Sequence, residues 1–148
     1  MIIFTFELAR SSKKAKALRN GNEMISSNDR LHYRVKSELA AHLRALSRDQ
    51  AIHNAPLSGY EPFSKNRPCR VGVRVYPPTR RRMDAPNLYP TIKPLIDGLT
   101  DAGVFTDDNN TVITSMTFIP GNEISGTKKY RIEILIQEGM DEVWQTCR

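Results

Sequence analysis

The chain has 148 residues, of which 39% are hydrophobic and 26% charged, and this composition is typical of one soluble globular domain. The net charge of +6 favours anionic partners such as nucleic acid, although charge alone identifies none. Two distant cysteines, Cys69 and Cys147, argue against a disulfide framework and a zinc site. The apolar start is too short for a membrane span and lacks a cleavable leader. We therefore expect one domain over residues 1–148, located in a reducing cytoplasm and independent of membranes.

The first part of the chain contains a predicted strand followed by a strongly basic segment. Residues 2–8 alternate and are rich in β-branched and aromatic types, which predicts a strand. Residues 10–22 carry cations and no acid, which predicts a mobile basic loop. Two interpretations stay open for this loop: a solvated surface insertion, or an arm that contacts phosphates. Its cations are Arg10, Lys13, Lys14, Lys16 and Arg19.

A first helix is predicted from N-cap residues at 26–29 to about Arg48, because apolar side chains then recur every three or four residues. The expected buried face consists of Leu31, Val35, Leu39, Leu43 and Leu46. The three histidines have no metal-ligand spacing, so we interpret them as surface residues. They are His32, His42 and His53. Residues 55–68 are rich in Pro, Gly, Ser and Asn and predict a loop.

The alternation of residues 71–76 predicts a half-buried strand, which Pro77 and Pro78 end. The basic run Arg80, Arg81 and Arg82 and then Asp84 follow the end of this strand. A rigid strand can hold functional groups in such a loop.

A second helix is predicted with Thr91 as N-cap and Ala102 as its last residue. In that register Pro94 lies in the first turn, where its missing N–H has no partner to lose. Lys93 and Asp97 are then neighbours at i,i+4. Taken alone, this pair would be an ordinary surface ion pair worth about 0.3–0.5 kcal/mol.

The last part of the chain predicts a polar turn and two strands. Asp107 and Asp108 begin the turn, residues 112–119 and 130–137 read as strands, and residues 120–126 are expected to form a hairpin loop between them. The tail at residues 138–148 has no clear periodicity. The predicted class is therefore α+β, with the order β-α-β-α-β-β.

Cations beside carboxylates within residues 80–108 suggest phosphate chemistry. Carboxylates repel a phosphodiester unless a hard cation such as Mg²⁺ lies between them. A metal-dependent nuclease is the resulting hypothesis.

The same stretch resembles the RusA family of Holliday-junction resolvases. The resemblance also takes in the opening strand, the segment at residues 27–30 and the two last strands, and so covers most of the chain. The residues that carry the central pattern are, in order, Arg80, Arg81, Arg82, Asp84, Asn87, Lys93, Asp97, Ala102, Gly103, Phe105, Asp107 and Asp108.

The resemblance implies a homodimer with a mixed sheet packed against two main helices, which binds four-way DNA junctions and cuts them with Mg²⁺ or Mn²⁺. By position, Asp84 and Asp108 would be catalytic metal ligands, and Lys93 would be a catalytic residue that faces the phosphate. The arginines at 80–82 and Asn87 would contact DNA. We expect these arginines and the loop cations Lys13, Lys14, Lys16 and Arg19 to contact backbone phosphates rather than bases.

Two features depart from the family pattern. Pro86 stands where the family has a second aspartate, and the spacing from Asn87 to Lys93 is three residues longer. Asp97 or Asp107 would have to supply the missing metal ligand. The alternative hypothesis is a DNA-binding protein of the same fold that selects branched structures and cuts poorly.

Overall fold

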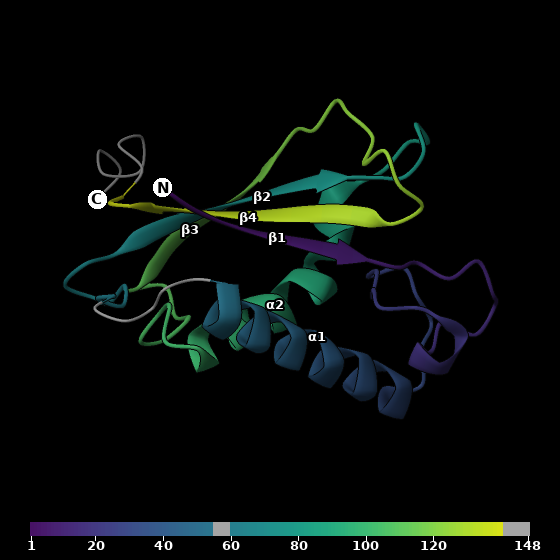
Figure 1. Cartoon of the computed structure of the whole chain (residues 1–148), viewed down its shortest axis with the longest axis horizontal. Helices are drawn as coiled ribbons and strands as arrows, with labels where there is room; N and C mark the ends of the chain where they lie inside the picture. Colours follow the sequence, from purple (N-terminus) through teal and green to yellow (C-terminus); the bar gives the residue numbers. More distant parts are fainter. Residues whose placement is uncertain (55–59, 141–148) are drawn as a thin grey trace.

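Four strands and two α-helices form the described part of the chain, residues 1–54 and 60–140 of the computed structural model (Figure 1). The predicted order β-α-β-α-β-β is confirmed, and two short 3-10 helices lie in the connections. The first part of the predicted loop, residues 55–59, and the tail from residue 141 onward lie outside the described residues. The elements are β1 (Ile2–Leu8), η1 (Leu18–Asn20), α1 (Tyr33–Asn54), β2 (Cys69–Tyr76), η2 (Ala85–Leu88), α2 (Tyr89–Asp101), β3 (Ile113–Ile119) and β4 (Tyr130–Glu138).

The strands form one mixed sheet in the order β1-β4-β2-β3. β4 pairs antiparallel with both β1 and β2, whereas β3 pairs parallel with β2. The predicted hairpin between β3 and β4 is therefore wrong, because β2 lies between these two strands. Alternation identified each strand correctly, but it contains no information about which neighbour a strand pairs with.

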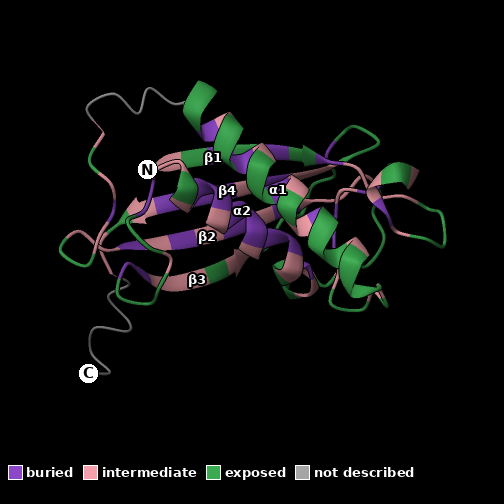
Figure 2. Cartoon of the chain, turned by 90° about the horizontal axis from the view of Figure 1, so that it is seen from below, coloured by how far each residue is buried: buried purple, intermediate pink, exposed green. Residues whose placement is uncertain are grey.

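Both helices cover the same face of the sheet (Figures 1 and 2). Alternate residues of the strands point into this layer, so the period-two pattern of the sequence becomes a buried face. The largest apolar contributions come from Phe4, Phe6, Leu8, Val71, Val73, Val75, Ile132, Ile134 and Ile136 of the sheet and from Leu43, Ile92, Leu95, Ile96 and Leu99 of the helices. Within residues 1–54 and 60–140, no helix is long and apolar enough to cross a membrane.

α1 begins later and ends later than predicted. Residues 26–29 form a turn of their own, in which the Asp29 carboxylate accepts the Ser26 N–H at 2.9 Å. These residues therefore do not cap the helix, which starts at Tyr33. Its last turns bury Ser47 and Ala51, two small residues that a count of large apolar side chains overlooks.

α2 begins at Tyr89, so Pro90 lies in its first turn and Pro94 lies inside it. The predicted N-cap role of Thr91 is wrong. The Thr91 hydroxyl is buried, accepts the Ile25 N–H at 2.8 Å and donates to the Ile25 carbonyl at 2.8 Å. The predicted end is close to the observed one, and Gly103 has the positive φ of +87° that a residue just beyond a helix often adopts.

The two helices cross in close contact at Gly98. A Cβ atom at this position would lie 2.3 Å from the Arg44 carbonyl oxygen. The Ser47 hydroxyl donates to the Leu95 carbonyl at 2.6 Å, and Arg44 binds the Asp101 carboxylate through two nitrogens at 2.6 and 2.8 Å. These contacts fix the helix that carries Lys93 and Asp97.

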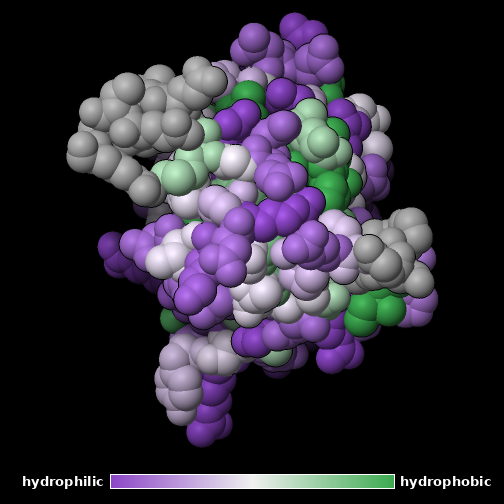
Figure 3. Space-filling view, turned by 90° about the vertical axis from the view of Figure 1, so that its left-hand side faces the viewer, coloured by the Kyte–Doolittle hydropathy of each residue, from purple (hydrophilic) through white to green (hydrophobic). Residues whose placement is uncertain are grey.

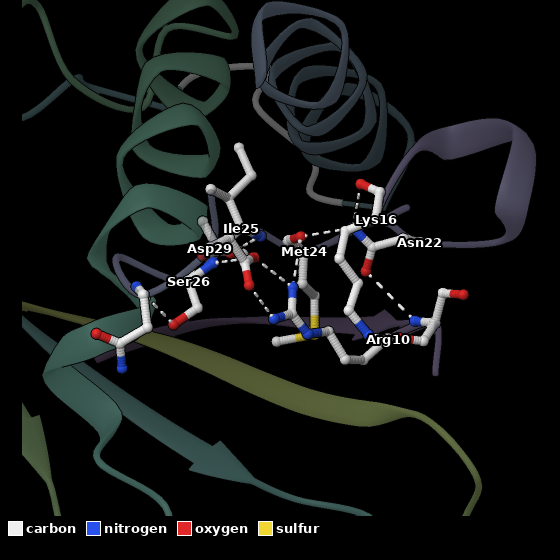
Figure 4. Close-up of polar contacts among 10 residues, drawn as sticks. Arg10, Lys16, Asn22, Met24, Ile25, Ser26 and Asp29 are labelled. Carbon is white, nitrogen blue, oxygen red and sulfur yellow. Dashed lines mark hydrogen bonds and ion pairs between the residues drawn. The ribbon is translucent and has the colours of Figure 1, made fainter. Parts of the chain in front are cut away.

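Internal hydrogen bonds hold the basic loop, whose mobility stays a prediction (Figure 4). Arg10 binds both oxygens of Asp29 at 2.6 and 2.7 Å. The fully buried Asn22 donates to the carbonyls of Lys16 and Met24 at 2.9 and 2.7 Å. Arg10 is thus engaged within the protein through both of its terminal nitrogens.

Candidate active site

Three of the predicted site residues meet at one point. Lys93 and Asp97 lie one turn apart on α2, and Asp108 follows that helix in the loop to β3. The Lys93 ammonium donates to the Asp97 carboxylate at 2.7 Å and also to the Asp108 carboxylate. The structure therefore places one cation between two acidic side chains.

A tight reversal of the chain brings Asp108 back to Lys93. After α2, the N–H of Gly103 bonds to the Thr100 carbonyl and that of Val104 to the Leu99 carbonyl, both at 3.0 Å. Val104 and Phe105 then enter the core. The chain returns along the helix as a result, which explains how residues 15 positions apart come into contact.

Asp107 has a different role from Asp108. Its carboxylate accepts the N–H of Asp108 at 2.7 Å and the side-chain amide of Asn109 at 3.0 Å. These bonds stabilise the turn, as short acidic side chains commonly do.

Lys93 and Asp108 reinforce each other's ionised state. The hydrogen bond from Lys93 is the main reason that the pKa of Asp108 is lowered. Burial by itself would lower the pKa of Lys93, but its hydrogen bonds to Asp108 and Asp97 outweigh burial and raise it. The Lys93 side chain is still 43% exposed, so an anionic ligand can reach the ammonium from solvent.

A hollow of about 290 Å³ opens beside these charges. Tyr89 lies four residues before Lys93 on the same helix and is 46% exposed. An aromatic ring next to an ammonium suits a nucleotide, whose base can stack while its phosphate pairs with the cation. We did not predict this environment from the sequence, although the i,i+4 spacing of Tyr89 and Lys93 was a visible signal. The hollow is lined by Tyr89, Lys93, Ile96, Asp108, Asn110, Ile113 and Met116.

The predicted metal ligands are only partly assembled. Asp97 and Asp108 both direct a carboxylate oxygen to the Lys93 ammonium, and carboxylate oxygens are the ligands that a hard divalent ion takes. Among residues 1–54 and 60–140, however, no group of three or more His, Cys, Asp or Glu side chains is arranged to hold a metal. The expected convergence of Asp84 and Asp108 with a third carboxylate, Asp97 or Asp107, is not seen in this arrangement. Asp84 is exposed at the start of η2, and Asp107 is committed to its own turn.

The predicted DNA-contacting residues come from the loop after β2, from η2 and from the basic loop. Arg80, Arg81 and Arg82 are exposed beyond the end of β2. Asn87 instead joins two segments, since its backbone carbonyl and side-chain oxygen accept bonds from Ser27 at 2.8 and 3.2 Å.

In the basic loop, the side chains of Lys13, Lys14 and Arg19 are exposed. Lys16 is partly buried and donates to the carbonyl of Ser11. The loop cations Lys13, Lys14 and Arg19 therefore have side chains that a ligand can reach.

The surface at the end of the molecule where the chain passes from α2 to β3 is mainly hydrophilic (Figure 3). Its hydrophobic patches are scattered. This character fits a polar partner better than an apolar one.

No protein-family model matches the chain, and no curated protein matches it. Its function is therefore inferred from its own residues.

Proposed function

We propose that the protein is a Mg²⁺-dependent endodeoxyribonuclease that resolves four-way DNA junctions, similar to the RusA family. The observation that carries this proposal is the Lys93 ammonium held between Asp97 and Asp108 at the mouth of an open hollow. A structural surface ion pair needs one carboxylate, whereas this lysine has two and remains accessible.

Lys93 would bind the phosphodiester. A lysine ammonium has three N–H donors, and two of them are used by Asp97 and Asp108. The remaining donor can bond to a phosphate oxygen and offset the negative charge that develops there during hydrolysis.

Asp97 and Asp108 would hold Mg²⁺, with Mn²⁺ as a substitute. Such a cation, when bound, supplies Lewis acidity and a more acidic water for phosphodiester hydrolysis. Asp84 does not contribute to this arrangement, and its assignment as a catalytic ligand depends on the family resemblance alone.

The exposed cations would position DNA without reading its sequence. Arginines at residues 80–82 and lysines at residues 13 and 14 occur as runs, which suits backbone phosphates. A symmetric homodimer would present one active site to each of two equivalent strands of a junction. We propose that this activity serves DNA recombination and repair in the cytoplasm of a bacterial or phage-infected cell.

A second candidate function is junction binding with weak cleavage. Pro86 replaces the second aspartate of the family pattern, and within residues 1–54 and 60–140 two carboxylates converge on Lys93. Both features reduce the expected affinity for a divalent cation.

The substitution Asp108→Asn tests the assignment of the active site. We expect cleavage of a synthetic four-way junction to fall by about 100-fold, while the dissociation constant for the junction stays nearly unchanged. Asp49→Asn is the matched control, because Asp49 is exposed on α1 and, among the described residues, its carboxylate pairs with its neighbour Arg48. Equal cleavage by Asp108→Asn and the wild type would refute the assignment.

A further inference from the structure

A second hollow, of about 320 Å³, lies between the basic loop and the start of α1 and is lined by residues other than those of the candidate active site. Four permanent cations line it: Lys14, Lys16, Arg19 and Arg30. Among the described residues around it, Glu38 is the one carboxylate. The hollow therefore has a positive potential that favours an anion.

Part of the lining of this hollow is apolar. Ala17, Leu31 and Val35 contribute to it, and Ala17 is buried. A site for a bare anion would not need these side chains. Cations beside hydrocarbon instead suit a ligand that has a charged group and an apolar part.

The loop that carries these cations is fixed before any ligand arrives (Figure 4). The Asn22 side chain is fully buried, and its amide donates to the Lys16 carbonyl at 2.9 Å. Its oxygen accepts the N–H of Ser11 at 3.3 Å, and the Arg10–Asp29 pair anchors both ends of the segment. A preorganised loop loses less conformational entropy when a ligand binds.

We infer that this hollow binds one nucleotide, with its phosphate on the cations and its base against Leu31 and Val35. The volume is at the small end of ligand sites and accommodates a single nucleotide rather than a duplex. A free nucleoside monophosphate and the phosphorylated end of a DNA strand share this chemistry. The inference does not depend on the nuclease proposal, because it involves no divalent cation.

Calorimetric titration of the full-length protein without divalent cations tests the ligand class. We expect thymidine 5′-monophosphate to bind at least about tenfold more tightly than thymidine, which lacks the phosphate, or inorganic phosphate, which lacks the base. No binding of the monophosphate, or equal affinity for inorganic phosphate, would overturn the inference. A 5′-phosphorylated tetrathymidylate separates the two sources. Tighter binding of the oligonucleotide would identify a strand end, and equal or weaker binding would identify a free nucleotide.

Paired variants test the location. Arg30→Glu should weaken binding of the monophosphate by about tenfold or more. Lys36→Glu changes the charge equally at an exposed α1 position that does not line the hollow, so it should have a much smaller effect. Equal effects of the two variants would refute a specific site. Thermal unfolding of each variant shows whether it is folded.

Two further substitutions separate the parts of the site. Val35→Ser should weaken nucleotide binding and leave inorganic phosphate binding unchanged, because it alters only the apolar part of the lining. Lys93 lies in the other hollow, so Lys93→Ala should retain the nucleotide binding that Arg30→Glu weakens. Loss of binding in Lys93→Ala would move the ligand to the candidate active site and overturn the inference.

Discussion

The substitution Gly98→Ala tests the close crossing of α1 and α2 that positions Lys93 and Asp97. The added Cβ would lie 2.3 Å from the Arg44 carbonyl oxygen, 2.7 Å from Ser47 Cβ and 2.9 Å from the Arg48 nitrogen. Ordinary contacts begin near 3.4 Å, so the helices would have to separate by about 1 Å. Two of the three obstacles are backbone atoms, which cannot rotate away.

The expected net effect is a loss of stability. Overpacking of this kind costs about 1–3 kcal/mol, and the rigid obstacles favour the upper end of that range. Alanine recovers about 1 kcal/mol through its higher helix propensity. We therefore expect the free energy of unfolding to fall by about 2 kcal/mol, which corresponds to a decrease in Tm of about 4–8 °C.

Thermal and urea unfolding followed by circular dichroism measure this effect. Gly103→Asn is the control, because a Cβ at residue 103 meets no atom within 4 Å and asparagine tolerates its φ of +87°. We expect that control to lose no more than about 1 kcal/mol. A Gly98→Ala protein as stable as the wild type would show that the helices are not in close contact at this point.

Three further predictions concern charge and assembly. Burial alone would raise the pKa of Asp29, but bonds from Arg10 and the Ser26 N–H lower it below its ordinary 3.8. The ionised carboxylate therefore stabilises the fold at neutral pH and loses this effect as pH falls through the lowered pKa. Asp29→Asn should reduce Tm at pH 7 and have little effect near pH 2, and an equal reduction at both would contradict this reasoning. Replacing Lys13, Lys14 and Arg19 by alanine should flatten the salt dependence of junction affinity by about two to three units, since each neutralised phosphate contributes about 0.9 to the slope; an unchanged slope would identify a surface that DNA does not contact. Light scattering should give twice the 16.8 kDa chain mass, and a monomer with and without DNA would count against the homodimer.

The regular elements could be predicted because their signals are local. A strand with one buried face alternates with a period of two, so residues 2–8 and the later strands were found nearly at their observed bounds. The pairing of strands was not predictable in the same way. β4 lies between β1 and β2, and its sequence alternates identically whichever neighbour it has.

The helix starts were missed for a related reason. Residues 26–29 contain good capping side chains, but Asp29 is bound by Arg10 from 19 residues away. Thr91 likewise bonds to Ile25, 66 residues away. Capping rules consider only neighbours in sequence, so they could not detect these competing partners.

The site was predictable where helix geometry determines it. Lys93 and Asp97 are neighbours because of their i,i+4 spacing, whereas Asp108 was found through the family resemblance. The second hollow depends on the packing of the basic loop against the start of α1, and no local sequence pattern indicates this packing.

The most direct test of the central claim is a titration of Mg²⁺ and Mn²⁺ with the wild-type protein on a synthetic four-way junction and on a linear duplex of the same sequence. We predict cleavage of the junction in paired strands that rises and saturates with either cation, while the linear duplex is spared. A junction that is bound but remains uncut across the whole range of both cations would contradict the claim that this protein is a nuclease.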